Sequence, residues 1–119
     1  MRRVDVLVIV NDPAYGSERS YNALRLAGAL AKRDDVCVRV FLMGDAVTCA
    51  LAGQRVPDGF YHLDRMLTAV VRHGGDVGCC GTCLDARALT EAPLVDGARR
   101  STLDELTDWT LAADKTVAF

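Results

Sequence analysis

Continuous apolar stretches alternate along the chain with stretches in which apolar residues recur every three or four positions. Val4 to Val10 is nearly all β-branched or aliphatic, which is typical of a strand covered on both faces. The same kind of pattern predicts further strands at 36–43, 76–79 and 115–119. Helical spacing predicts helices from Ser17 or Ser20 to about 33, at 45–53, at 61–73 and at 102–113.

Capping residues stand where these helices are expected to begin and end. Asp45 is placed to act as the side-chain N-cap of the short second helix, and Gly74 follows the third. Thr102 and Glu105 match the capping box, in which the hydroxyl and the carboxylate each accept a hydrogen bond from the other residue's free backbone N–H group.

This order of elements predicts one domain, residues 1–119, with an α/β fold: a three-layer α/β/α sandwich around a mainly parallel central sheet of four to five strands. Ligand sites in such sheets gather at the carboxyl ends of the strands. Three polar segments follow strands and are expected to meet there, at 11–17, 44–48 and 79–83.

Composition narrows the possible partners and the compartment. The formal net charge is −2, and the Lys and Arg residues are scattered, so neither nucleic acid nor an anionic membrane is indicated. No apolar segment approaches the roughly 20 residues that cross a bilayer. We therefore expect a cytoplasmic protein, a compartment in which clustered cysteines are more often catalytic, redox-active or metal-binding than structural.

Three of the five cysteines lie in the pentapeptide Cys79-Cys80-Gly81-Thr82-Cys83, at the end of a predicted strand. Cys80 would face backbone N–H groups of a helical turn that starts near Thr82, which favours the thiolate. Gly81 allows a tight bend and leaves space beside the sulfur. Cys83 is placed to attack a sulfur-loaded Cys80 or to form a disulfide with it. Arg87 is placed to add positive charge, although a solvated surface arginine is the favoured interpretation.

Several alternatives remain open. His73, Cys79, Cys80 and Cys83 include ligand types that suit zinc, but neighbouring strand residues diverge, so we predict no metal and no cofactor. A thioredoxin-type redox pair shares the same C-x-x-C spacing. An interpretation of the three cysteines as inert packing residues is less favoured than the redox pair but more favoured than zinc. Tyr15-Gly16-Ser17 precedes a helix and is placed to bind an anion, although plain capping is favoured.

Four segments together resemble the DsrE/DsrF-like family, in particular its YchN-like branch. They are Asn11 to Glu18, Val40 to Val47, Cys80 to Arg87 and Asp108 to Lys115, in order along the whole chain. The resemblance implies an α/β/α subunit, a hexamer of like or unlike chains, and a cysteine, here matched by Cys80, that carries sulfane sulfur as a persulfide. Relatives follow the loop arginine with glycine, whereas this chain has Ala88, so we expect a different backbone path beyond Arg87.

The residues and the resemblance together predict a protein whose Cys80 carries or transfers sulfane sulfur with help from Cys83, as a sulfurtransferase or as a sulfur carrier. Sulfur donor and acceptor proteins are the expected partners, and self-association is expected as a homohexamer, with a trimer or dimer as alternatives. We expect the subunit to expose apolar side chains that form part of the interface between subunits, namely Phe60, Tyr61 and Trp109. A thiol-disulfide redox protein and a non-catalytic oligomeric module, whose cysteine loop lines a small-molecule pocket, are the alternatives.

Overall fold

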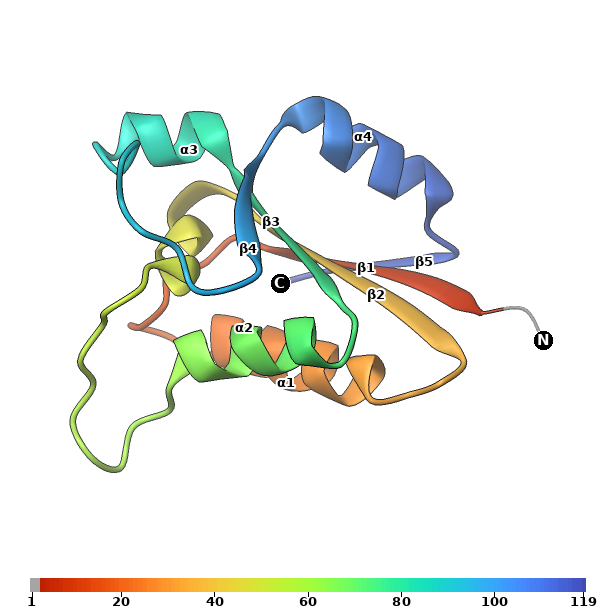
Figure 1. The fold of residues 1–119 in the computed structure, drawn as a ribbon, viewed down its shortest axis with the longest axis horizontal. Helices are drawn as coiled ribbons and strands as arrows, with labels where there is room; N and C mark the ends of the chain where they lie inside the picture. The colour runs from red at the N-terminus through yellow and green to blue at the C-terminus, as the bar shows by residue number, and fades with distance from the viewer. Residues whose placement is uncertain (1–2) are drawn as a thin grey trace.

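The structure is a computed structural model that describes residues 3–119. Within these residues, five strands form one parallel sheet in the order β4-β3-β2-β1-β5 (Figure 1). The strands are β1 (Val4–Val10), β2 (Val36–Leu42), β3 (Asp76–Cys80), β4 (Ala98–Ser101) and β5 (Lys115–Ala118). The predicted α/β sandwich with a mainly parallel sheet is confirmed.

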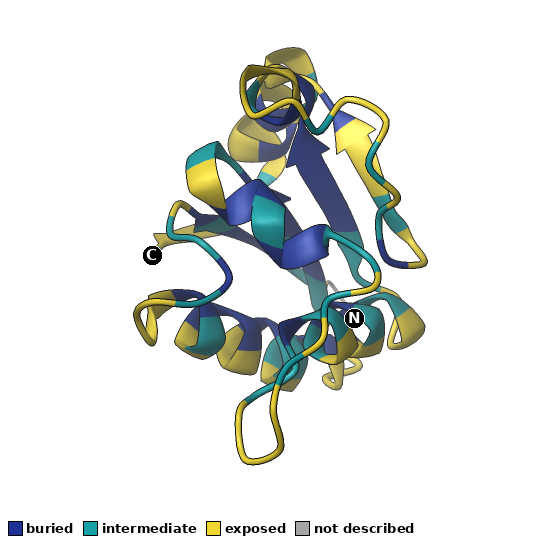
Figure 2. Ribbon diagram, turned by 90° about the vertical axis from the view of Figure 1, so that its left-hand side faces the viewer, coloured by how far each residue is buried: buried dark blue, intermediate teal, exposed yellow. Residues whose placement is uncertain are grey.

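Helices cover both faces of the sheet. In Figure 1, α1 (Arg19–Ala31) and α2 (Leu63–Arg72) lie on one face, and α3 (Gly81–Ala86) and α4 (Leu103–Ala112) lie on the other. A 3₁₀ helix, η1 (Gly44–Ala50), follows β2. Figure 2 shows buried residues along the central strands and on the helix sides that face them, as expected for a sheet that right-handed crossovers enclose.

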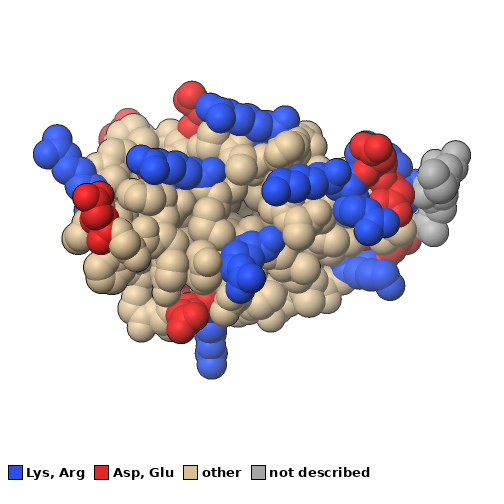
Figure 3. Space-filling model, turned by 90° about the horizontal axis from the view of Figure 1, so that it is seen from below, with Lys and Arg blue, Asp and Glu red and all other residues tan. Residues whose placement is uncertain are grey.

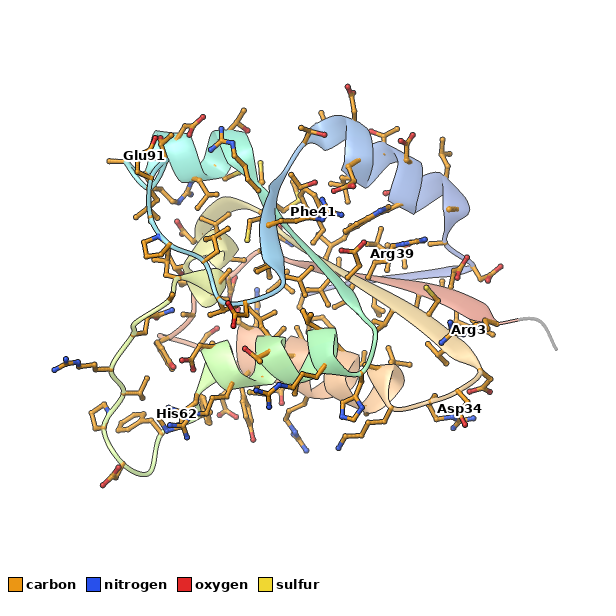
Figure 4. All side chains as sticks on the ribbon, in the orientation of Figure 1. Arg3, Asp34, Arg39, Phe41, His62 and Glu91 are labelled. Carbon is orange, nitrogen blue, oxygen red and sulfur yellow. The ribbon has the colours of Figure 1, made fainter. Side chains whose placement is uncertain are left out.

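The core on the α4 side is built around Trp109. Its ring, 7% exposed, meets the Phe41 ring edge-on with centroids 6.0 Å apart. The guanidinium groups of Arg39 and Arg99 lie 5.8 and 5.6 Å from the Trp109 ring centre, and Figure 4 shows Phe41 and Arg39 beneath α4. Trp109 is therefore a core residue, and its expected exposure at an interface is wrong.

Several predicted boundaries change. β3 runs one residue further than predicted, to Cys80, because it pairs with β4, a strand that was not predicted. Helix α2 begins at Leu63 because His62 before it is extended. Thr102 caps α4 as predicted, with its hydroxyl accepting from the Glu105 N–H at 3.2 Å, but the Glu105 carboxylate contacts Arg99 and Ser101 instead of completing the box.

Charge is dispersed over the face of the molecule that α1 and α2 cover. Figure 3, which views the molecule from the side of α1 and α2, shows basic side chains set apart from one another, with acidic ones between some of them. Among residues 3–119, no helix is both long and apolar enough to span a membrane.

Candidate functional site: a cysteine pair at the junction of β3 and α3

The cysteine pentapeptide spans the junction of a strand and a helix. Cys80 is the last residue of β3, where it pairs with Ser101 of β4, and α3 begins at the next residue, Gly81. The predicted loop at 79–83 is therefore wrong. The pairing with β4 holds the chain extended through Cys80, and the backbone then turns directly into the helix.

Cys80 is almost enclosed but still reaches the surface, with 8% of its area exposed. Its Sγ lies 3.2 Å from the Thr82 hydroxyl oxygen. Burial opposes the charged form of this thiol, but hydrogen bonds from the side chains of Thr82 and Cys83, and from their backbone N–H groups, outweigh it. The pKa of Cys80 is accordingly lowered, so the site favours a thiolate.

Cys83 behaves in the opposite way. Burial and the hydrogen bond with Cys80 raise the pKa of its thiol, although the Gly44 N–H donates to its Sγ at 3.1 Å and Arg87 lies nearby. The Cys83 thiol donates a hydrogen bond to the Cys80 sulfur, so the two cysteines titrate as a pair in which Cys80 ionises first. All five cysteines are free, so this is a dithiol with one nucleophilic member.

Arg87 and Asp45 connect α3 to η1. The Arg87 Nε and one terminal nitrogen lie 3.0 and 2.9 Å from the same Asp45 carboxylate oxygen, and the other terminal nitrogen donates to the Cys83 carbonyl at 3.0 Å. Arg87 is thus held in place, contrary to the solvated surface arginine that the sequence favoured. Asp45 is not the N-cap of η1, because Met43 occupies that position and the Asp45 carboxylate is engaged by Arg87.

The first residue beyond Arg87 has a backbone conformation suited to glycine. Ala88 has φ of 58°, which is the left-handed region, and its N–H bonds to the Asp85 carbonyl at 3.1 Å. The substitution of alanine at this position therefore introduces local strain, because a Cβ is disfavoured there.

Cys79 differs from Cys80 in its burial and in its pKa. It is fully buried, and burial, with further effects from Cys49 and Cys80, raises its pKa to about 12. Burial raises the pKa of Cys49 to about 11. Both remain protonated at neutral pH, so neither of these two buried thiols competes with Cys80 as a thiolate.

The structure gives the zinc alternative little support. Among residues 3–119, no group of three or more His, Cys, Asp or Glu side chains is arranged to hold a metal ion. His73 lies at the C-terminal end of α2.

Tyr15, Gly16 and Ser17 lie at a separate groove. The groove has a volume of about 720 Å³, and neither Cys80 nor Cys83 is among its lining residues. It is walled by the segment before α1 and by the loop before α2: Tyr15, Gly16, Ser17, Glu18, Gln54, Arg55, Val56, Pro57, Phe60 and Tyr61. This groove is therefore not the small-molecule pocket of the non-catalytic alternative, because that pocket was expected to be lined by the cysteine loop.

The polar segment at 11–17 supports the groove and also touches η1. The Tyr15 hydroxyl donates to the Tyr61 carbonyl at 2.9 Å, and the Ala14 N–H donates to the Thr48 hydroxyl at 3.0 Å. The three polar segments therefore meet at the carboxyl ends of the strands, as predicted. Neither serine is the N-cap of α1: Glu18 holds that position without a side-chain cap, and Ser17 bonds to Asp12 at 2.8 Å.

One residue beside the cysteines was missed from the sequence. Arg100 of β4 lies against Gly81, where an added Cβ would come within 2.8 Å of its Nε atom. The only signal was the pair Arg99-Arg100 ahead of the helix cap, which carries no strand pattern.

Comparison with known proteins agrees with this architecture. The model of the DsrE/DsrF-like family matches residues 5–119. Protein YchN of Escherichia coli K12 is 42% identical over 115 residues, covering 96% of this chain and 97% of that protein. An uncharacterized protein of Methanopyrus kandleri is 33% identical over 118 residues, with 98% and 95% covered.

The solved structures give the same result. The crystal structure of the ychN protein from E. coli superposes with a TM-score of 0.91 at 41% identity, and all of both chains is covered. The match to the family model and the likeness of both sequence and structure to YchN show that the chain belongs to the DsrE/DsrF-like family, in its YchN-like branch.

Proposed function

We propose that this protein carries sulfane sulfur on Cys80 as a persulfide and passes it to an acceptor thiol. Membership of the DsrE/DsrF-like family supports a sulfur-relay type of role. The observation that carries the proposal is the unequal cysteine pair, in which the pKa of Cys80 is lowered while that of Cys83 is raised. A thiolate is the nucleophile that sulfur transfer requires.

Loading and discharge are both exchanges at sulfur. The Cys80 thiolate attacks the outer sulfur of a donor persulfide, R–S–SH, so that a Cys80–sulfur bond forms, the donor S–S bond breaks and the donor leaves as R–S⁻. An acceptor thiolate then attacks the outer sulfur on Cys80, takes it as a persulfide and restores the Cys80 thiolate. Neither step needs an external oxidant or reductant.

Cys83 supplies a second route of discharge. Its thiol is hydrogen bonded to Cys80, so it is within reach of the inner sulfur of a loaded Cys80. Attack there forms the Cys80–Cys83 disulfide and releases the outer sulfur as H₂S, and an external dithiol must then reduce the disulfide. This route links the sulfur-transfer function to its alternative, a thiol-disulfide redox function that uses the same pair.

Self-association is part of the proposal. Apolar side chains remain exposed on α4 and before α2: Leu103 is 68%, Leu111 82% and Phe60 59% exposed. Side chains of this kind on one subunit favour burial against another copy. We infer a homohexamer from the family resemblance, with a trimer or dimer as alternatives, and sedimentation velocity at micromolar concentration measures which one forms.

The proposed function is tested by intact-protein mass spectrometry after exposure to glutathione persulfide. The native chain is expected to gain one sulfur, and Cys80→Ser is expected to gain none. Cys37→Ser is the matched control, because Cys37 lies at the far end of β2 from the site, and this variant should load like the native chain. Equal loading of Cys80→Ser and native protein would exclude Cys80 as the carrier.

A further inference from the structure

The side chain of Arg100 lies against the first residue of α3, Gly81. Arg100 lies on β4, one residue before Ser101, which is the strand partner of Cys80. Its side chain, 47% exposed, crosses the start of α3 and binds Asp85 with both terminal nitrogens, at 2.8 and 2.6 Å. Asp85 also accepts from the Thr90 hydroxyl at 2.8 Å, which fixes the carboxylate.

Gly81 creates the space for this contact. A Cβ on Gly81 would lie 2.8 Å from the Arg100 Nε, 2.9 Å from its Cζ and 3.0 Å from a terminal nitrogen. The guanidinium therefore packs directly on the backbone of the residue that follows Cys80. Any side chain at position 81 would displace it.

The contact is electrostatic as well as steric. The hydrogen bonds to Asp85 are the main reason that the pKa of Arg100 is raised, and the charges of Asp85, Cys80 and Glu91 add to the effect. Attraction between two charges is mutual, so the guanidinium that is favoured by the Cys80 thiolate also favours that thiolate. Figure 4 shows Glu91 beyond the end of α3, well away from β3.

We propose that Arg100 is a positioning residue for Cys80: it holds a positive charge against Gly81, next to Cys80, and stabilises the Cys80 sulfur as an anion. This inference deepens the proposed function and rests on it, since a sulfur carrier needs its cysteine ionised at neutral pH. Asp85 orients the Arg100 guanidinium. Its negative charge also partly neutralises the guanidinium, which weakens the stabilisation of the Cys80 anion.

Other titratable and charged groups lie on the elements packed around the junction of β3 and α3. They are Cys83 and Asp85 on α3, Arg87 at its end, Asp45 on η1, which Arg87 engages, Glu91 beyond α3 and the buried thiols of Cys79 and Cys49. Of the two arginines in this set, Arg87 is paired to η1 and donates to the Cys83 carbonyl, whereas Arg100 packs on Gly81, the residue next to Cys80.

The test is the pH profile of Cys80 alkylation by iodoacetamide, measured by peptide mass spectrometry. In Arg100→Gln, the rate below the Cys80 midpoint should fall about two- to fivefold, and the rates should converge at high pH where every chain is ionised. Arg100→Lys keeps the charge and should retain most of the native rate. Added salt should shrink the difference between native and Arg100→Gln protein.

Asp85→Asn separates charge from structure. If Arg100 acts through its charge, removing the neutralising carboxylate should raise the low-pH alkylation rate, opposite to Arg100→Gln. If the Arg100–Asp85 pair serves only to hold α3 in place, both variants should lower the rate together, and that result would overturn the proposal. Arg99→Gln is the control, because it removes the adjacent charge, which pairs with Asp76 and Glu105, and its profile should match the native one.

The alkylation profile does not depend on persulfide chemistry. If native protein loads no sulfur while Arg100→Gln still shifts the profile, the proposed function fails and the role of Arg100 stands. If native protein loads sulfur on Cys80 and the profile of Arg100→Gln is unchanged, the role of Arg100 fails and the proposed function stands.

Discussion

The Thr82 hydroxyl offers the most direct control of Cys80 ionisation. It lies 3.2 Å from the Cys80 Sγ, and Cys80 is only 8% exposed, so water replaces it poorly. Thr82→Val keeps the shape of the side chain and removes the donor. A hydrogen bond to a charged group contributes about 1.5–3 kcal/mol, and sulfur is a weak acceptor, so we take the lower value of about 1.5 kcal/mol.

That loss corresponds to a rise of about one unit in the pKa of Cys80. At a pH below the midpoint, the iodoacetamide rate at Cys80 should therefore fall about tenfold, whereas Thr82→Ser, which keeps the hydroxyl, should match the native chain. The alkylation rate measured across pH by peptide mass spectrometry gives the midpoint directly. An unchanged midpoint in Thr82→Val would refute the account of how the thiolate is stabilised.

Four further changes test other parts of the structure. Ala88→Gly relieves the left-handed strain but increases the entropy of the unfolded chain, so urea denaturation should show a net gain of about 0.5–1 kcal/mol; a loss would argue against strain at this position. Thr102→Ala should lower the free energy of unfolding by about 1 kcal/mol, with Thr102→Ser close to native, because the capping hydroxyl is lost. Hydrogen bonds from Arg100 and, to a lesser extent, from Thr90 lower the pKa of Asp85 from 3.8 to about 2. The ionised carboxylate therefore stabilises the fold above pH 3.8, and this stabilisation is lost as the pH falls towards 2. Acid unfolding of Asp85→Asn should lack this component, and an acid unfolding curve identical to that of the native chain would contradict it. Mild oxidation should link Cys80 to Cys83 and leave Cys37 and Cys49 free, which peptide mapping of the oxidised chain can contradict by finding any other pair.

The elements that the sequence predicted well are those whose burial leaves a simple pattern. β1 and β2 are enclosed by helices and neighbouring strands, so nearly every position is apolar and the strand is evident. Thr102 was recognised as a cap because its role is local and depends on a residue three positions away. Cys80 was identified because three cysteines within five residues are unusual for packing.

β4 left no such pattern. It has four residues, lies at the edge of the sheet, and exposes Arg99 and Arg100, so neither alternation nor apolar content marks it. Its absence from the prediction explains the shortened β3, the supposed loop at the cysteines and the omission of Arg100, because each depends on pairing between segments about 20 residues apart in sequence.

Contacts between side chains that are distant in sequence could not be predicted from local sequence patterns either. Asp45 was assigned to a helix cap because such residues usually cap, but its partner Arg87 lies 42 positions away. Trp109 was expected at an interface because helical periodicity does not tell which face meets the sheet, and contact with Phe41 places it in the core.

The central claim is tested most directly by following a labelled sulfur atom. The reduced native protein is exposed to glutathione persulfide whose outer sulfur is isotopically labelled, freed of donor, and then mixed with an acceptor thiol before alkylation, digestion and mass spectrometry. The account predicts the label on the Cys80 peptide before the acceptor is added and on the acceptor afterwards, with no label retained by Cys80→Ser. Label on Cys37 or Cys83 at the loading step, or label that stays on Cys80 in the presence of acceptor, would contradict it.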